Sequence, residues 1–228
     1  MPIGELNEGP LHAALKAIYS ANGGEQEVPV ETFVADAVRG GVMYEIQTGS
    51  FSGLGRKMRS LADVGPVVLV HPIPASTVIV KEPAEPDGVV SRRRSPKKGA
   101  LVHIVNELVY MPSMLNHDNF SVEVVLTVEE ELRRYDPRKR RGRGGWRVLQ
   151  RRLMELGEGV RLTRMSDLYQ FLVDELAEPF GTRELADALR QPLYIGQKMA
   201  YCLREAGVTE IVGKKGNALQ YRNIAETR

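Results

Sequence analysis

Three polar residues interrupt an otherwise apolar pair of strands in the segment DAVRGGVMYEIQ. The glycine pair in its middle suits a two-residue hairpin turn, because both glycines can take a positive φ. Such a turn sets a register in which Asp36 faces Glu45. Gln47 shares the face of Glu45, because side chains alternate along a strand. The sequence therefore predicts that Asp36, Glu45 and Gln47 cluster on one side of a hairpin.

Two carboxylates that face each other across a hairpin repel, since their Cβ atoms lie about 5 Å apart. Three arrangements would offset this repulsion: the face is open to water, a neighbouring Arg or Lys neutralises the pair, or a divalent cation bridges the carboxylates. Magnesium is the natural candidate for such an ion, because it prefers carboxylate oxygens together with water and phosphate. The apolar residues Val34, Val38 and Met43 on the same face argue against the open, hydrated arrangement.

The elements around this hairpin follow an α/β pattern built on a mixed sheet. Apolar residues at helical spacing predict helices, and valine-rich runs predict strands. The expected helices are residues 10–24, 51–65 and 100–115, and the expected strands are residues 27–40, 41–49, 66–73 and 120–134. A stretch rich in Pro and Gly at 81–99 is expected to form a loop or a short edge hairpin.

This order of elements resembles the PD-(D/E)XK nuclease superfamily, which has the restriction-endonuclease-like fold. The family's Asp matches Asp36, and its Glu-x-Lys matches Glu45-Ile46-Gln47. Its first-helix acid matches Glu8, with Glu5 as the second choice. The resemblance covers residues 1 to about 80 and implies a mixed sheet flanked by helices.

The resemblance also implies a metal-dependent endonuclease that hydrolyses phosphodiester bonds in DNA. Asp36, Glu45 and the backbone carbonyl of Ile46 would hold Mg²⁺ or Mn²⁺, with Glu8 further from the ion. The ion would lower the pKa of a bound water and stabilise the charge that builds on the phosphate. Gln47 would position this water, and the products would be a 5′-phosphate and a 3′-hydroxyl.

Gln47 departs from the family pattern, which usually has lysine at this position. An amide can hydrogen-bond a water or a phosphate oxygen, but it has no charge with which to lower the pKa of a water. Three alternatives stay open. The metal supplies more of the activation, Lys57 or Arg56 from the next helix takes the place of the lysine, or the domain has lost its activity.

Charge is distributed unevenly along the chain, whose net charge is +2. Residues 1–90 hold 6 Lys and Arg against 11 Asp and Glu, whereas residues 91–228 hold 25 against 18. Basic clusters in the second part could bind phosphate groups without reading base sequence. The residues expected to contact DNA are Lys57, Arg93 and Arg94, and, in the second cluster, Arg138, Lys139, Arg140 and Arg141. For the second cluster, a solvated linker that contacts nothing is the alternative.

The C-terminal part resembles a winged helix-turn-helix, a fold that binds DNA in many bacterial and archaeal regulators. The N-terminal part of its recognition helix would read the major groove. The residues expected to be exposed there are Tyr194, Gln197, Lys198 and Tyr201, and Lys214 and Lys215 are expected at the tip of the wing. Winged helices also bind proteins, so that alternative stays open.

Together these features predict an α/β nuclease-like domain at residues 1–135, a basic linker at 136–150 and a winged helix at 151–228. The leading interpretation is a DNA endonuclease that uses Mg²⁺ or Mn²⁺ and is positioned by its C-terminal domain. The fold is compatible with a homodimer, because single domains of this kind often need a second copy to cut both strands. One alternative is a non-catalytic DNA-binding regulator or adaptor that keeps the fold. A third interpretation is a domain that recognises protein partners in a defence or repair complex.

Composition indicates the cellular compartment in which the protein is expected to work. No stretch of the sequence approaches the ~18 apolar residues of a membrane span, and the N-terminal residues lack the apolar segment of a signal peptide. The single cysteine, Cys202, cannot form a disulfide within the chain and is expected in the core. These features favour a reducing cytoplasm and no association with a membrane.

Overall fold

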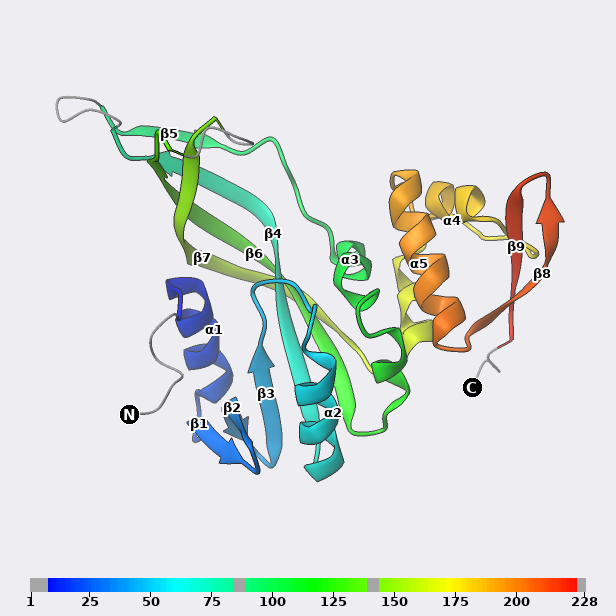
Figure 1. Cartoon of the computed structure of the whole chain (residues 1–228), viewed down its shortest axis with the longest axis horizontal. Helices are drawn as coiled ribbons and strands as arrows, with labels where there is room; N and C mark the ends of the chain where they lie inside the picture. Colours follow the sequence, from blue (N-terminus) through cyan, green and yellow to red (C-terminus); the bar gives the residue numbers. More distant parts are fainter. Residues whose placement is uncertain (1–7, 84–88, 139–143, 225–228) are drawn as a thin grey trace.

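A mixed sheet of seven strands is the centre of the computed structural model, which describes residues 8–83, 89–138 and 144–224 (Figure 1). Its strands are β1 Glu25–Val30, β2 Phe33–Arg39, β3 Val42–Ile46, β4 Val67–Lys81, β5 Ser91–Arg94, β6 Phe120–Tyr135 and β7 Trp146–Leu162. They are ordered β1-β2-β3-β4-β6-β7, and β5 pairs with β4. Strands β3, β4 and β6 are parallel neighbours, whereas β2 and β7 run antiparallel to theirs.

Helices cover both faces of this sheet, which confirms the predicted α/β class. Helix α1 (Pro10–Ser20) places Leu11 and Leu15 in one buried cluster with Tyr44 and Ile46. Helix α2 (Gly55–Val64) places Met58, with Leu61 and Ala62, in a second cluster with Met43 and Leu69. Tyr44 and Ile46 alternate with Met43 and Glu45 along β3, so the strand contributes to both layers. Figure 1 shows the two helices on either side of β3.

The outer halves of β4, β6 and β7 extend beyond the helices as an arm. Strand β5 pairs only with this outer part, where Val78 is the partner of Arg94 and Lys81 the partner of Ser91. The register of β4 against β6 shifts between Pro74 and Ser76, because prolines lack the N–H that a regular ladder needs. The strand expected at 66–73 is therefore longer, and the region 81–99 contains the edge strand that the sequence offered as one of two alternatives.

The predicted linker lies between two strands of this sheet. Strands β6 and β7 pair from Tyr135 opposite Trp146 down to Val122 opposite Leu162. Residues 136–145 therefore join neighbouring strands of one sheet instead of two domains, and residues 151–162 belong to the sheet. Opposite charges stabilise the pairing of these two strands, since Glu130 faces Arg152 and Glu131 faces Arg151.

The helix predicted at 100–115 is broken into short helical turns. These are η2 Leu101–Ile104, α3 Val105–Leu108 and η3 Pro112–Asn116. Pro112 begins the last turn, where its missing N–H costs least. Most apolar residues of these turns belong to the buried cluster that the sheet shares with α5.

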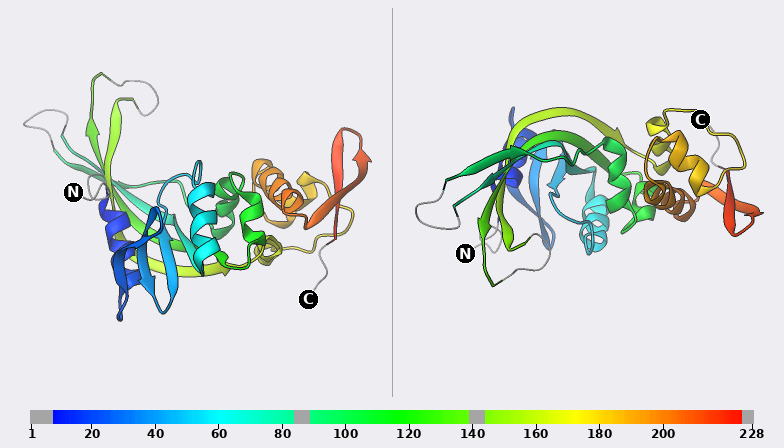
Figure 2. Two further views of the ribbon diagram at one scale, coloured as in Figure 1. Left: turned by 60° about the horizontal axis from the view of Figure 1, so that its bottom comes forward. Right: turned by 90° about the horizontal axis from the view of Figure 1, so that it is seen from above.

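A C-terminal lobe follows β7 and shares its hydrophobic core with the sheet. Its elements are η4 Met165–Phe171, α4 Thr182–Ala188, α5 Leu193–Glu205, β8 Thr209–Lys215 and β9 Ala218–Asn223. Leu162, Leu168 and Leu203 belong to one continuous cluster of buried residues. Cys202 lies in this cluster, as predicted, and burial raises the pKa of its thiol to about 12. Figure 2 shows the arm and the lobe at opposite ends of the molecule.

No helix within the described residues is long and apolar enough to cross a membrane.

Candidate functional site

The hairpin of β2 and β3 has the register that the sequence predicts. Val38 is the partner of Met43, and Arg39 is the partner of Val42. Gly40 and Gly41, at the turn, have φ values of 59° and 77°, which favour glycine. Asp36 and Glu45 therefore come to the same part of the hairpin.

Asp36 lies where the regular pairing of β2 with β3 stops. Its Oδ2 accepts a hydrogen bond of 2.7 Å from the backbone N–H of Ile46 and lies 3.1 Å from His12 Nε2. Burial alone would raise the pKa of Asp36, but the bonds from His12 and Ile46 outweigh it and hold this pKa below its usual value. Asp36 is therefore an ionised carboxylate with one oxygen fixed in place.

Glu45 is more deeply buried, since its side chain is 8% exposed. Its Oε1 is paired with the ammonium group of Lys57, which comes from α2. Its Oε2 is buried and has no hydrogen-bond partner among the described residues. Burial and the negative charge of Asp36 raise the pKa of Glu45 to about 7, although Lys57 opposes them.

His12 joins two acids at the beginning of α1. Its Nδ1 lies 2.6 Å from Glu8 Oε1, and its Nε2 faces Asp36. Burial alone would lower the pKa of His12, but the hydrogen bonds and charges of Asp36 and Glu8 raise it to about 9. Lys16 continues this network, because its Nζ donates to Glu8 at 2.7 Å and to Glu27 at 2.5 Å. Sequence reasoning found Glu8 but missed His12, whose one signal was its position one helical turn after Glu8.

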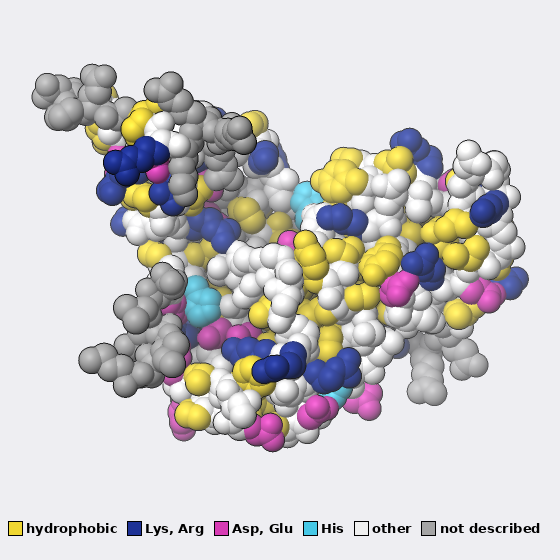
Figure 3. All heavy atoms as spheres, in the orientation of Figure 1, with side chains coloured by type: hydrophobic (Ala, Val, Ile, Leu, Met, Phe, Trp, Pro, Cys, Tyr) yellow, Lys and Arg dark blue, Asp and Glu magenta, His cyan; other side chains and the backbone are white. Residues whose placement is uncertain are grey.

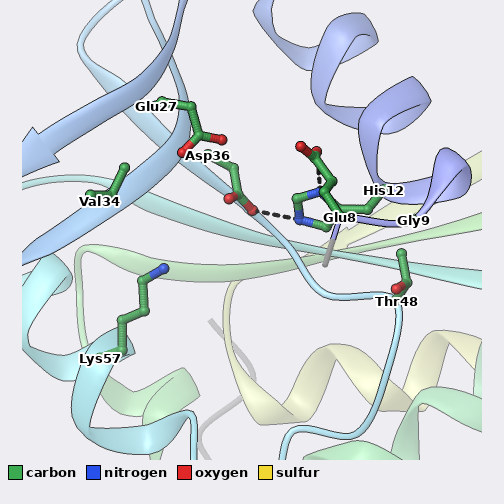
Figure 4. A pocket seen from close by; sticks show the side chains of 8 residues that line it. All are labelled: Glu8, Gly9, His12, Glu27, Val34, Asp36, Thr48 and Lys57. Carbon is green, nitrogen blue, oxygen red and sulfur yellow. Dashed lines mark hydrogen bonds and ion pairs between the residues drawn. The ribbon is translucent and has the colours of Figure 1, made fainter. Parts of the chain in front are cut away.

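Part of this network surrounds a cavity of about 360 Å³, the acid pocket, which Glu45 does not line (Figure 4). Its lining consists of Glu8, Gly9, His12, Glu27, Val34, Asp36, Thr48 and Lys57. Figure 4 shows Asp36 from β2 turned toward His12 and Lys57 approaching from the opposite side. The acid pocket thus brings together carboxylates from three segments with a lysine and a histidine.

Gln47 does not line the acid pocket. Its side-chain nitrogen donates to the backbone carbonyl of Ser50 at 2.6 Å, so the amide closes the loop that follows β3. Arg56 is exposed, whereas Lys57 lines the acid pocket. Of the two basic residues considered for the place of the family lysine, Lys57 lines the acid pocket and Arg56 does not.

The repulsion between Asp36 and Glu45 is offset by cationic side chains. His12 pairs with Asp36 and Lys57 pairs with Glu45, as the second of the three sequence-based arrangements expects for a basic neighbour. Repulsion alone therefore does not call for a bridging ion. In the described part of the chain, no three His, Cys, Asp or Glu side chains are arranged as a ready group of metal ligands.

The residues expected to contact DNA belong to four parts of the chain: α2, β5, the residues that follow β6, and the C-terminal lobe. Arg93 and Arg94 of β5 are both exposed, and Arg93 lines a cavity beside the arm that Arg94 does not line. Arg138 is exposed, and its backbone N–H donates to Asp136. Lys139, Arg140, Arg141 and the alternative acid Glu5 lie outside the described residues.

Three of the four residues expected to contact DNA from α5 are exposed. Tyr194 and Tyr201 are 49% and 39% exposed, and Gln197 is exposed as well. Lys198 is half-buried, however, and its Nζ donates to Asn106 of α3 at 2.8 Å. The structure therefore turns the Lys198 side chain toward α3. At the wing, Lys214 and Lys215 are exposed near the end of β8.

Comparison with other proteins places most of this chain in one family. A protein of Treponema pallidum (strain Nichols), described as "Uncharacterized protein", is 28% identical over 227 residues, which cover 97% of this chain and 88% of that protein. No solved structure matches the chain. The family model described as "Domain of unknown function (DUF8091)" matches residues 9–163, from the beginning of α1 to the end of β7. The chain therefore belongs to the DUF8091 family.

Proposed function

We propose that the chain is a metal-dependent DNA endonuclease with a restriction-endonuclease-like domain and a C-terminal winged helix. The order α1, β1, β2, β3, α2, β4 supports this proposal, because it is the order of the nuclease fold that the sequence resembles. Strands β3 and β4 are parallel and joined through α2, so Lys57 comes back to the end of β3. Sites in such sheets commonly lie at the carboxyl ends of the parallel strands.

One observation supports a divalent cation among these residues, and the proposal rests on it. Glu45 Oε2 is buried without a hydrogen-bond partner among the described residues, and a buried carboxylate oxygen in that state is costly. Both hydrogen bonds of Asp36 use Oδ2 and leave Oδ1 for another ligand. The N–H of Ile46 points to β2, and the carbonyl of the same residue faces the same strand. Asp36, Glu45 and this carbonyl would hold Mg²⁺ or Mn²⁺, with Glu8 further away.

The side chains of the acid pocket would then have distinct tasks. A bound divalent ion supplies a water of lowered pKa and stabilises negative charge on phosphate. Ile46 N–H and His12 hold Asp36 in one orientation, so this carboxylate need not reorganise when substrate binds. Lys57 holds a positive charge at the wall of the acid pocket, where it can donate to an oxygen of the scissile phosphate.

A second candidate function is a non-catalytic DNA-binding adaptor. It is favoured by the pairing of both acids within the chain, since His12 and Lys57 already neutralise them. In this case the acid pocket would only hold α1 and α2 against the sheet.

A cleavage assay separates the two candidates. The full chain is incubated with supercoiled, branched and single-stranded DNA in Mg²⁺ or Mn²⁺, beside Asp36→Asn, Glu45→Gln and the control Glu158→Gln, an exposed acid on β7. We expect cleavage by the wild type and the control, and a loss of roughly 10²-fold or more in the other two variants. Cleavage that persists in Asp36→Asn and Glu45→Gln would come from a contaminant. No cleavage by any protein, with DNA binding intact, would establish the adaptor.

A further inference from the structure

Three cavities adjoin one another along one side of the molecule. The acid pocket shares Thr48 with a second cavity of about 320 Å³. That cavity shares Ile73, Pro74 and His103 with a third, of about 770 Å³, between the arm and the beginning of α5. Figure 3 shows the surface hollowed between the arm and the C-terminal lobe. We call the three together the groove; it runs from the end of β3 across β4 to the arm.

Unpaired cations gather at the arm end of the groove. Arg93, Lys97 and Lys98 line it and form no ion pair with any described residue. Arg133 also lines it, but this arginine is paired with Glu131. Positive charge in a concave surface concentrates the field and attracts an anion more strongly than the same charge on a flat surface.

A further cation lines the middle of the groove. Arg151 reaches from β7 to donate to the backbone carbonyl of Thr48. Its Nη1 forms an ion pair with the buried Glu129 at 3.6 Å, so Arg151 is partly neutralised within the chain. Since Lys57 lines the acid pocket, each of the three cavities has at least one basic side chain. This series suits a ligand with repeated negative charges better than a single anion.

The opposite wall at the arm end contributes an aromatic ring. Tyr194, at the beginning of α5, lines the third cavity and is 49% exposed. Exposed aromatic rings beside a basic groove are the usual platforms for bases of single-stranded nucleic acid. The combination of a stacking ring and a row of cations distinguishes a nucleic-acid strand from other polyanions.

We propose that the groove binds one unpaired nucleic-acid strand, with its phosphates along Arg93, Lys97, Lys98 and Arg151 and a base on Tyr194. The strand then leads into the acid pocket, and this inference rests on the proposed function in taking the acid pocket as the place of reaction. The strand is single because the groove has basic groups along one course and a ring that can reach a base only when it is unstacked.

Binding measured without divalent metal tests the groove independently of cleavage. Fluorescence anisotropy in EDTA follows a labelled single-stranded DNA and the matching duplex over a range of salt concentrations. The variant Arg93→Ala/Lys97→Ala/Lys98→Ala is compared with Arg94→Ala, which removes the next arginine of β5 on its other face. Tyr194→Ala is compared with Tyr110→Ala, which removes a similarly exposed ring that does not line the groove.

We expect the triple variant to bind single-stranded DNA about 10- to 100-fold more weakly near 0.1 M salt. The slope of log K against log[salt] should become shallower by about 2, since each lost phosphate contact contributes about 0.7 on a single strand. Tyr194→Ala should weaken binding by roughly tenfold, whereas Arg94→Ala and Tyr110→Ala should bind like the wild type.

If Arg94→Ala weakened the binding of single-stranded DNA as much as the triple variant, or if neither variant weakened it, the groove would not be the binding site. If the protein bound the duplex more tightly than the single strand, and the triple variant weakened that binding, the groove would bind duplex DNA and not a single strand. Loss of binding in the triple variant, with no cleavage by the wild type, would support the groove and contradict the nuclease.

Discussion

Lys57→Ala is expected to lower DNA cleavage by roughly 10²-fold or more, whereas Gln47→Ala is expected to leave the rate within about threefold. Lys57 lines the acid pocket and pairs with Glu45, so its loss removes the positive charge beside the reacting phosphate. Gln47 is bound to the backbone of Ser50 and lies outside the lining of the acid pocket. The measurement is the initial rate of DNA cleavage in Mg²⁺ at saturating DNA.

A conservative variant distinguishes the effect of the positive charge of Lys57 from the effect of its side chain on folding. Lys57→Arg keeps a cation for Glu45 and should retain more activity than Lys57→Ala, and circular dichroism should show that both remain folded. If Gln47→Ala lost as much activity as Lys57→Ala, then Gln47, and not Lys57, would act in place of the family lysine.

Phe51→Ala is expected to destabilise the protein by about 3–5 kcal/mol, because this ring is fully buried and its removal leaves a cavity. Phe51 lies between β3 and α2 and packs edge-on against His71, with ring centroids 5.0 Å apart. Its backbone N–H donates to Glu107 at 2.9 Å. The residue therefore anchors the connection that carries Lys57 to the acid pocket, and chemical denaturation measures the loss of its packing.

Tyr110→Ala is the matched control for Phe51→Ala, since it removes an aromatic ring that is 55% exposed. Its free energy of unfolding should stay within about 0.5 kcal/mol of the wild type. A similar loss in both variants would mean that Phe51 is not the anchor of this connection.

The hairpin of the candidate site could be predicted because its signals are local. A glycine pair, alternating side chains and two acids equidistant from the turn define the register without knowledge of the rest of the fold. The predicted register is confirmed, and so is the α/β class with a mixed sheet flanked by helices. The resemblance to nucleases and to winged helices stays a prediction.

The partners of the two acids could not be read in the same way, because they come from other elements. His12 and Asp36 are 24 residues apart and meet only because α1 packs on the face of β3 that carries Tyr44 and Ile46. Lys57 was one of two basic residues considered, and only the direction of α2 decides between them. Gln47 follows the last residue of β3, where side-chain alternation no longer determines direction.

Strand β7 was missed because its polar residues look like a linker when they stand alone. Arg151 and Arg152 indicate a strand only when they are considered together with Glu131 and Glu130, which lie opposite them on β6. The residues before the strand are rich in arginine and glycine, so the sequence does not indicate that β7 begins at Trp146. A search for opposite charges at pairing distance would have found this strand.

Binding of Mn²⁺ to the purified protein tests most directly whether Asp36 and Glu45 hold an ion. Isothermal titration calorimetry should show Mn²⁺ binding to the wild type and to Glu158→Gln, and a weakening of at least tenfold in Glu45→Gln and Asp36→Asn. Binding that is equal in all four proteins, or absent in the wild type, would contradict the metal site and leave His12 and Lys57 as the lasting partners of the two acids.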